Sequence, residues 1–338
     1  MTHLTYLEAG IVGLVQGISE MFPVSSLGHN VLIPALIGGS WAKDLNVAAP
    51  DSPYLAFIVG LHVATAIALL IYFWRDWVRI SVGFVASLRE RRVHTADQKL
   101  AWLIILATIP VGLAGLAFEH AFRVIFSKPV IAAIFLAVNG VILIAGERYR
   151  TRASLAADAA LREARARAAA VTAPARPLHA MPAGGSAAVA ADPPRYERDD
   201  PDAAVQADRR LATMGYPRAL LIGSAQILAL LAGISRDGVA MVAGMARGLS
   251  REDAARFAFL LATPVILAAG VLKVPDLAGP LAAGIRGQIL FGSVLSGVGA
   301  YLSVRFLLRY LRTRTLTPFG VYCLIVGLGS VAFLGLAR

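Results

Sequence analysis

The sequence has little charge and almost no cysteine, and each shortage excludes a class of protein. Only 16% of its 338 residues are charged while 57% are hydrophobic, a balance that excludes an ordinary soluble domain of this length. Its one cysteine, Cys323, excludes a disulfide within the chain. The first residues lack a Lys/Arg segment and a small-residue cleavage site, so we expect no removable signal peptide. Neither a G-x-x-x-x-G-K-[ST] loop nor a G-x-S-x-G turn is present, which gives nucleotide hydrolases and serine esterases no support.

What the sequence has instead is a series of apolar segments long enough, or nearly so, to cross a bilayer. A hydrocarbon core about 30 Å thick needs roughly 20 apolar residues in a helix. We therefore predict an all-α polytopic membrane protein with six transmembrane helices. The predicted spans are Tyr54 to Trp74, Leu100 to Phe118, Pro129 to Gly146, Ala255 to Leu272, Ile289 to Leu308 and Pro318 to Leu336.

The basic residues collect between these spans. The chain has 32 Lys and Arg against 21 Asp and Glu, a net charge of +11, which by itself would suggest nucleic acid. Because the arginines gather in loops 75–99, 147–218 and 305–314, we interpret them by the positive-inside rule and predict contact with membrane lipids and none with nucleic acid. With those loops in the cytoplasm, both termini lie outside.

The segment 147–216 differs from the rest of the chain. It is rich in Ala, Arg, Pro and Asp and has almost no aromatic or large aliphatic residues, so we predict a cytoplasmic, largely disordered insertion. Its first part, 153–170, is compatible with an alanine-rich helix resting on anionic headgroups. The insertion separates a first repeat, 1–146, from a second, 217–338.

Two polar, glycine-containing stretches lie outside the predicted spans. They read GLVQGISEMFPVSSLGH (13–29) and GSAQILALLAGISRDG (223–238), and four residues recur at a constant offset of 210: Gly13 and Gly223, Gln16 and Gln226, Ser25 and Ser235, Gly28 and Gly238. Three spans follow each stretch, starting from opposite sides of the membrane. We therefore predict two re-entrant helical hairpins in an inverted-topology repeat, whose broken segments meet near the membrane midplane and line a cavity.

The two hairpins together would supply the groups that phosphoryl transfer needs. A buried arginine such as Arg236 requires an anionic partner, and its planar fork suits phosphate. A serine near a histidine offers a nucleophile and a base, and Glu20 would orient that histidine or hold a divalent cation that bridges phosphate oxygens. The candidate residues are Gln16, Glu20, Ser25, Ser26, Gly28, His29, Ser235, Arg236 and Asp237.

Structural alternatives exist for most of these residues. Ser25 or Ser26 would cap a helix after the proline, Arg236 would form a structural ion pair with Asp237, and Glu20 would only neutralise Arg236. His62, on the first span, fits a structural hydrogen bond as well as a place in the site.

The same residues resemble the undecaprenyl-diphosphate phosphatase family, also called the bacitracin-resistance proteins. Members carry an acidic or amide residue, then a glutamate, then PVSSTGH in the first hairpin and GxSRSG in the second; here the stretches read QGISEMFPVSSLGH and GISRDG. The likeness continues in YFWRDW (72–77), LIILATIPVGLAGLAFE (103–119) and GLSREDAARFAFLLATPVILAAG (248–270), so it covers nearly the whole chain outside the central segment.

This resemblance implies an enzyme of the bacterial plasma membrane that removes the terminal phosphate from a C55 polyprenyl diphosphate, recycling the lipid carrier of cell-wall synthesis. The implied site opens to the outer face. Ser26 is the implied nucleophile, His29 its acid/base partner, and Arg236 the phosphate clamp, with Ser235 beside it. Gln16 and Glu20 match an element tied to catalysis and metal dependence, which implies Mg²⁺ or Ca²⁺ as cofactor, held by Glu20.

Three positions depart from the family pattern. Leu27 replaces a threonine next to the implied nucleophile, Gln16 takes the amide option, and Asp237 replaces a serine; of its possible roles, we favour replacement of the acid lost at position 16. A flippase for polyprenyl phosphate or another anionic lipid is the alternative function, since an inverted repeat also suits a transporter. The serine and histidine of the first hairpin favour the enzyme.

Overall fold

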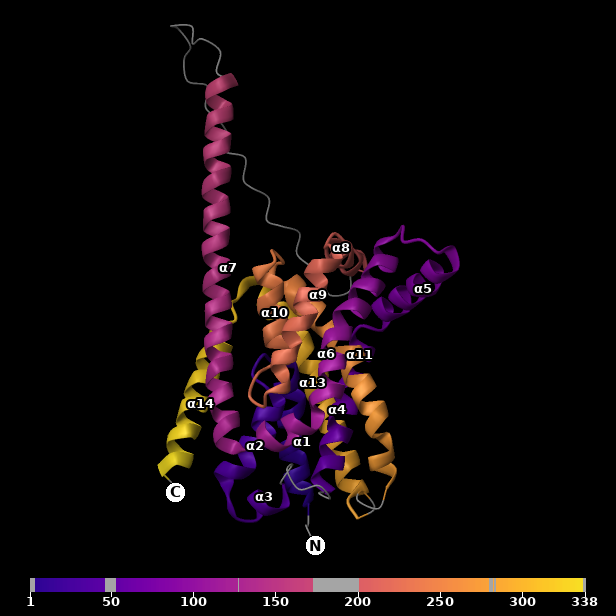
Figure 1. Ribbon diagram of the computed structural model, residues 1–338, viewed down its shortest axis with the longest axis vertical. Coiled ribbons are helices and arrows are strands. Elements are labelled where there is room, and N and C mark those ends of the chain that lie inside the picture. The colour runs from indigo at the N-terminus through magenta and orange to yellow at the C-terminus, as the bar shows by residue number, and fades with distance from the viewer. Residues whose placement is uncertain are drawn as a thin grey trace.

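The computed structural model describes residues 4–45, 53–126, 128–172, 201–279, 282 and 284–336, and every regular element in them is a helix (Figure 1). The helices are α1 (Tyr6–Met21), α2 (Ser26–Ile37), α3 (Gly39–Asp44), α4 (Pro53–Tyr72), α5 (Trp74–Glu90), α6 (Ala96–Phe126), α7 (Pro129–Thr172), α8 (Pro201–Ala212), α9 (Tyr216–Ala225), the 3₁₀ helix η1 (Gln226–Leu230), α10 (Arg236–Ala246), α11 (Arg251–Ala278), α13 (Arg286–Thr313) and α14 (Thr317–Leu336).

Five of these helices, within the described residues, are long and apolar enough to cross a membrane on their own. They lie in α6, α7, α11, α13 and α14, and each overlaps a predicted span. The predicted span 54–74 corresponds to α4, which meets the same criteria only together with α5, from which it is bent by 83°. The chain is therefore an all-α, multi-pass membrane protein, as predicted, and the count of six spans stays a prediction.

The two polar stretches each form a helix, a turn and a second helix. The first consists of α1 and α2, and the second of α9 with η1 and then α10. Figure 1 shows that they extend from opposite ends of the molecule and that their turns lie near mid-height. The start of α1 and the end of α14 are at the end from which the first hairpin extends, and the tips of α5 and α7 and the helix α8 are at the other end.

The segment 147–216 is more ordered at its two edges than its composition suggests. At its start, α7 continues without a break to Thr172, which includes the helix expected over 153–170. At its end, α8 buries Ala207 and Leu211. Residues 173–200 lie outside the described part of the chain, so the predicted disorder stays a prediction there.

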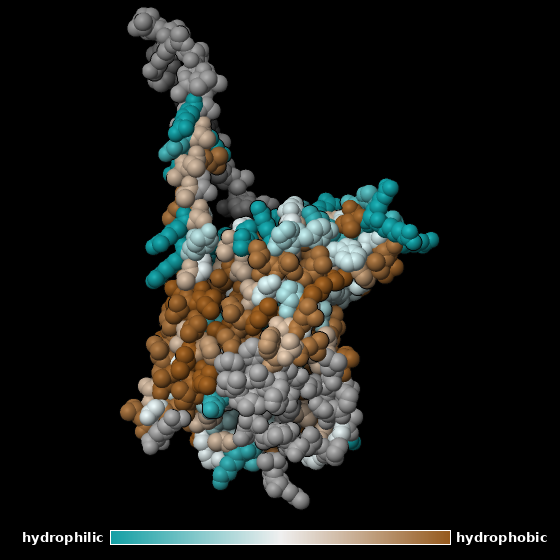
Figure 2. Space-filling view, viewed as in Figure 1, coloured by the Kyte–Doolittle hydropathy of each residue, from teal (hydrophilic) through white to brown (hydrophobic). Residues whose placement is uncertain are grey.

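A group of four charged side chains explains why α8 packs. Arg256 on α11 contacts Asp208 on α8 (Nε to Oδ1, 2.9 Å) and Asp76 on α5 (Nη2 to Oδ2, 3.0 Å), and Arg79 bridges the same two aspartates. Two carboxylates and two guanidinium groups balance, as buried charges require. The motifs YFWRDW and SREDAARF supply Asp76 and Arg256, so their place in this group is structural. In Figure 2 hydrophilic residues gather at this end, above the broad hydrophobic surface of the helical body.

Small residues bring several helices into backbone contact, as is common in membrane proteins. A Cβ added at Gly13 of α1 would lie 2.5 Å from the Gly292 oxygen of α13, and one at Gly140 of α7 would lie 2.6 Å from the Gly320 oxygen of α14. At Gly223 of α9 the closest atom is the Ala107 oxygen of α6, 1.9 Å away. The second hairpin therefore packs closely against α6.

We expect Gly223→Ala to lower the melting temperature of the purified protein in detergent, because the new methyl group overlaps the backbone of α6. Overpacking of this kind costs about 1–3 kcal/mol of the free energy of unfolding, or more. Gly112→Ala is the matched control on α6, where no atom lies within 4 Å of the added Cβ. Equal melting temperatures for the two variants would contradict the packing described.

Candidate active site

The turns of the two hairpins touch each other. A Cβ added at Gly28 would lie 3.0 Å from the Gly233 Cα, so the turns approach as closely as glycine allows. Between them lies the fully buried Asn139 of α7, whose Nδ2 donates to the Pro23 oxygen (2.9 Å) while its Oδ1 accepts from the Ser235 amide (3.0 Å). One amide side chain thus fixes both turns.

Each turn ends in a serine that caps the following helix. The Ser25 hydroxyl accepts from the Gly28 amide (3.2 Å) at the start of α2, and the Ser235 hydroxyl accepts from the Gly238 amide (3.1 Å) at the start of α10. These are the pairs that the offset of 210 matched, so the recurring residues build the same cap twice. Ser25 also has a φ of 68°, a strained value for a residue other than glycine.

The starts of α2 and α10 line a common cavity of about 440 Å³. Helix N-termini carry partial positive charge and free amide groups, so two of them at one cavity favour an anion there. Most of the remaining wall is apolar and includes Leu27, Ile58, Val111, Leu230, Val265 and Ile266. The polar residues of the lining are Ser19, Glu20, Ser25, Ser26, His62, Gln226, Ser235 and Arg236.

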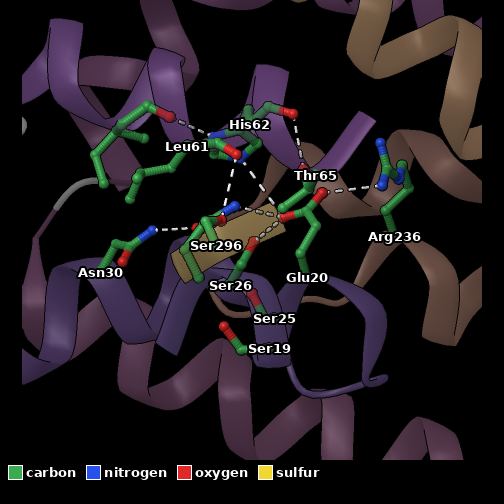
Figure 3. Close-up of polar contacts among 12 residues, drawn as sticks. Ser19, Glu20, Ser25, Ser26, Asn30, Leu61, His62, Thr65, Arg236 and Ser296 are labelled. Atoms are coloured by element: carbon green, nitrogen blue, oxygen red, sulfur yellow. Dashed lines mark hydrogen bonds and ion pairs between the residues drawn. The ribbon is translucent and has the colours of Figure 1, made fainter. Parts of the chain in front are cut away.

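Glu20, at the end of α1, is the centre of the polar part (Figure 3). Its Oε2 accepts a short hydrogen bond from the Ser26 hydroxyl and a second from Gln16 Nε2 (3.0 Å). His62 Nε2 lies 3.5 Å from the same oxygen, and Arg236 Nη2 donates to Oε1 (3.0 Å). Glu20 is only 9% exposed, so its charge is neutralised by these neighbours rather than by bulk water.

Arg236 connects this carboxylate to the second hairpin. It is the first residue of α10, and its Nε lies 3.3 Å from Asp237 Oδ1. Asp237 is buried and does not line the cavity, and its Oδ2 has no hydrogen-bond partner among the described residues. The structure therefore places Asp237 beside Arg236. We expected Asp237 to supply the carboxylate that is absent at position 16, but within the described chain it makes no contact with Gln16.

The two candidate histidines occupy different places. His29 lies on α2 with Nδ1 2.7 Å from the Ser25 oxygen and Nε2 2.8 Å from the Tyr322 hydroxyl of α14, against whose ring it stacks. It does not line the cavity. His62, by contrast, lines the cavity beside Glu20 and holds Nδ1 2.9 Å from the Ile58 oxygen. The acid/base role expected of His29 stays a prediction that the contacts of this conformation do not support.

Gln16 acts on the site indirectly. It is fully buried, donates to Glu20 and accepts from Asn30 Nδ2 (2.6 Å), and it does not line the cavity. Gln16 is therefore a positioning residue for the carboxylate. Leu27, the replacement for a threonine, does line the cavity and is 37% exposed.

The described residues contain no group of three or more His, Cys, Asp or Glu side chains that would hold a metal ion. Glu20 is the one carboxylate of the cavity lining. Mg²⁺ commonly takes one or two protein carboxylates together with substrate phosphates and keeps several waters. The site thus suits a cation shared between Glu20 and a bound phosphate, and the metal dependence expected from the sequence stays a prediction.

Comparison with known proteins agrees with this architecture. Residues 9–329 match the family described as bacitracin resistance protein BacA. The chain belongs to this family. It is 57% identical over 334 residues to a protein of Mycolicibacterium paratuberculosis named undecaprenyl-diphosphatase, with 99% of both chains covered. It is also 55% identical to undecaprenyl-diphosphatase 2 of Frankia alni, with 97% of both covered, and 36% identical to a protein of the same name in Chromobacterium violaceum, with 97% and 98% covered.

Three residues that sequence reasoning missed support the site of this BacA family member. Asn139 joins the turns, Asn30 holds Gln16, and Tyr322 contacts His29. Asn139 and Tyr322 lie inside predicted spans, and a polar side chain in an apolar span is the signal that would have found them. Asn30 follows PVSSLGH directly and carried no signal of its own.

Replacing Asn139 by leucine should lower both stability and activity. The change leaves the Ser235 amide without its partner, at a cost of about 1–3 kcal/mol, and leaves the Pro23 oxygen with only the Cys323 thiol, 4.0 Å away, among the described residues. Melting temperature and phosphate release would be measured side by side. Ser154→Ala, on the exposed part of the same helix, is the control, and a variant at position 139 that behaves like this control would contradict the bridging role.

Proposed function

We propose that this BacA family member is an integral membrane undecaprenyl-diphosphate phosphatase, which hydrolyses the lipid diphosphate to the lipid monophosphate and inorganic phosphate. One observation carries the proposal: the Ser26 hydroxyl donates to Glu20, whose other oxygen pairs with Arg236, at a cavity with mostly apolar walls. A nucleophile, a base and a phosphate-binding cation thus share one place. The names of the relatives support the choice of substrate.

The cavity suits an amphiphilic diphosphate. Its polar side chains cluster around Glu20, while Ile58, Val111 and Ile266 belong to the apolar wall. In the proposed complex the diphosphate lies at Arg236 and at the starts of α2 and α10, and the first prenyl units lie against the apolar wall, with the rest of the chain in the bilayer. Arg236 contacts Glu20 through Nη2 and Asp237 through Nε. Neither contact uses Nη1, and we propose that this nitrogen donates to a phosphate oxygen.

In the proposed reaction Ser26 is the nucleophile and Glu20 is its base. The serine oxygen attacks the terminal phosphorus as its proton passes to Glu20 Oε2. The bond from that phosphorus to the bridging oxygen breaks, and the lipid monophosphate leaves with the electron pair. Water then cleaves the phosphoserine to serine and inorganic phosphate. Arg236 and the helix N-termini stabilise the charge that develops on the phosphate oxygens.

A divalent cation, Mg²⁺ or Ca²⁺, belongs to the proposal as a partner of the substrate. Glu20 would hold it together with phosphate oxygens, and it would neutralise part of the diphosphate charge. Gln16 and His62 would keep the carboxylate in place for this task.

The proposed orientation has both termini outside the cell, since the positive-inside rule places the arginine-rich tips of α5 and α7 in the cytoplasm. The two hairpins would then be re-entrant elements of an inverted-topology repeat and would leave the site open to the outer face of the bacterial plasma membrane. Because the hairpins extend from opposite ends of the molecule, a flippase for an anionic lipid is the second candidate.

The first test is phosphate release from undecaprenyl diphosphate by the purified protein in detergent. We expect Ser26→Ala and Arg236→Ala to lower kcat/KM by about 10³-fold or more, and Glu20→Gln by roughly 10²- to 10⁴-fold. Melting temperatures would show that each variant is folded. If the folded wild type binds the lipid but releases no phosphate, the proposed enzymatic function is wrong and the flippase is the remaining candidate.

The two histidines give a second, sharper test of the reaction. We expect His62→Asn to lower kcat/KM about tenfold, because His62 Nε2 lies 3.5 Å from Glu20 Oε2 and its loss weakens the stabilisation of that carboxylate. His29→Asn should have a smaller effect and should resemble Tyr322→Phe, which removes the same contact. A folded His29→Asn variant as inactive as Ser26→Ala would show that His29 turns to the cavity, as expected from the resemblance.

A further inference from the structure

Gln226 is a polar side chain of the cavity lining for which the reaction above has no role. It directly follows α9 and begins η1, it is 1% exposed, and it lines the cavity together with Glu20 and Arg236. Neither its Oε1 nor its Nε2 has a hydrogen-bond partner within the described part of the chain. An unpaired buried amide is rare and unfavourable in folded proteins, so a partner from outside the chain is indicated.

The counterpart of Gln226 in the first hairpin is fully satisfied. Gln16, 210 residues earlier, donates to Glu20 and accepts from Asn30. The positions 210 residues after Glu20 and Asn30 are Leu230 and Ala240. Neither side chain can form a hydrogen bond. The second hairpin therefore has the glutamine without the two residues that would hold it, and this glutamine lines the cavity with both polar atoms of its amide unpaired among the described residues.

We propose that Gln226 is a further substrate-binding residue, whose Nε2 donates a hydrogen bond to a non-bridging oxygen of the bound diphosphate. This inference rests on the proposed function for the identity of the ligand. A phosphate oxygen is an acceptor, and Arg236 and two helix N-termini already attract it to this cavity. A neutral donor adds a contact to the phosphate without adding a charge that would compete with Arg236 for Glu20.

The test compares Gln226→Met with the wild type, because methionine has a similar length and forms no such hydrogen bond. Binding of inorganic pyrophosphate to the purified protein would be measured by calorimetry. The values of kcat and KM would be measured with undecaprenyl diphosphate as substrate. We expect Kd and KM to rise about tenfold to a hundredfold, the effect of one lost hydrogen bond to a charged group. The melting temperature should not fall, because the variant removes an unpaired polar group. Gln288→Met, whose side chain bonds the Leu4 oxygen away from the cavity, should leave both constants unchanged.

Two further results separate the possible failures. If Gln226→Met is folded and binds pyrophosphate and substrate as the wild type does, Gln226 is structural and the inference is wrong while the proposed function stands. If the wild type binds pyrophosphate through Gln226 but releases no phosphate, the inference stands and the proposed reaction is wrong. Gln226→Glu retains the size of the side chain but loses the N–H donor. If this variant binds pyrophosphate as tightly as the wild type does, the inference is wrong. It is also wrong if the wild type does not bind pyrophosphate.

Discussion

The pairing of Glu20 with Arg236 is the interaction on which the site depends. The two residues come from opposite halves of the chain, and both are largely shielded from water in an apolar body. Burying either charge alone would be strongly unfavourable, whereas the pair with its added hydrogen bonds is tolerated. The contact therefore requires the two hairpin turns to meet, and Asn139 and the glycines of the turns allow them to do so. A bound anion would compete with Glu20 for Arg236 and leave the carboxylate free to accept the serine proton.

The backbone also favours an anion at this cavity. Ser25 and Ser235 cap α2 and α10, so both helices begin at the cavity with their positive ends toward it. An apolar wall beside two helix N-termini favours a molecule with a phosphate at one end and a hydrocarbon at the other. A water-soluble phosphate ester would gain nothing from that wall, and an uncharged lipid would gain nothing from Arg236.

Much of this arrangement could be predicted from the sequence, because hydropathy and repeated residues can be identified without knowing which segments pack together. The apolar segments, the two polar stretches and the residues Glu20, Ser26 and Arg236 were all apparent, and the offset of 210 indicated equivalent positions that the structure shows as equivalent caps. Long-range packing was not apparent. The bend at Phe73, the packing of α8 through Asp208, and the turn of His29 toward Tyr322 depend on neighbours distant in sequence. A serine and a histidine three residues apart suggested a catalytic pair, but the first turn of α2 points them to different partners.

The most direct test of the central claim is an experimental structure of the purified protein with bound inorganic pyrophosphate. We predict that the anion lies between Arg236 and the first residues of α2 and α10, with a phosphorus atom within reach of the Ser26 hydroxyl and with Glu20 released from Arg236. Pyrophosphate bound elsewhere, or a Ser26 hydroxyl that faces away from it while Glu20 stays paired with Arg236, would contradict the claim that these two turns form the reaction site.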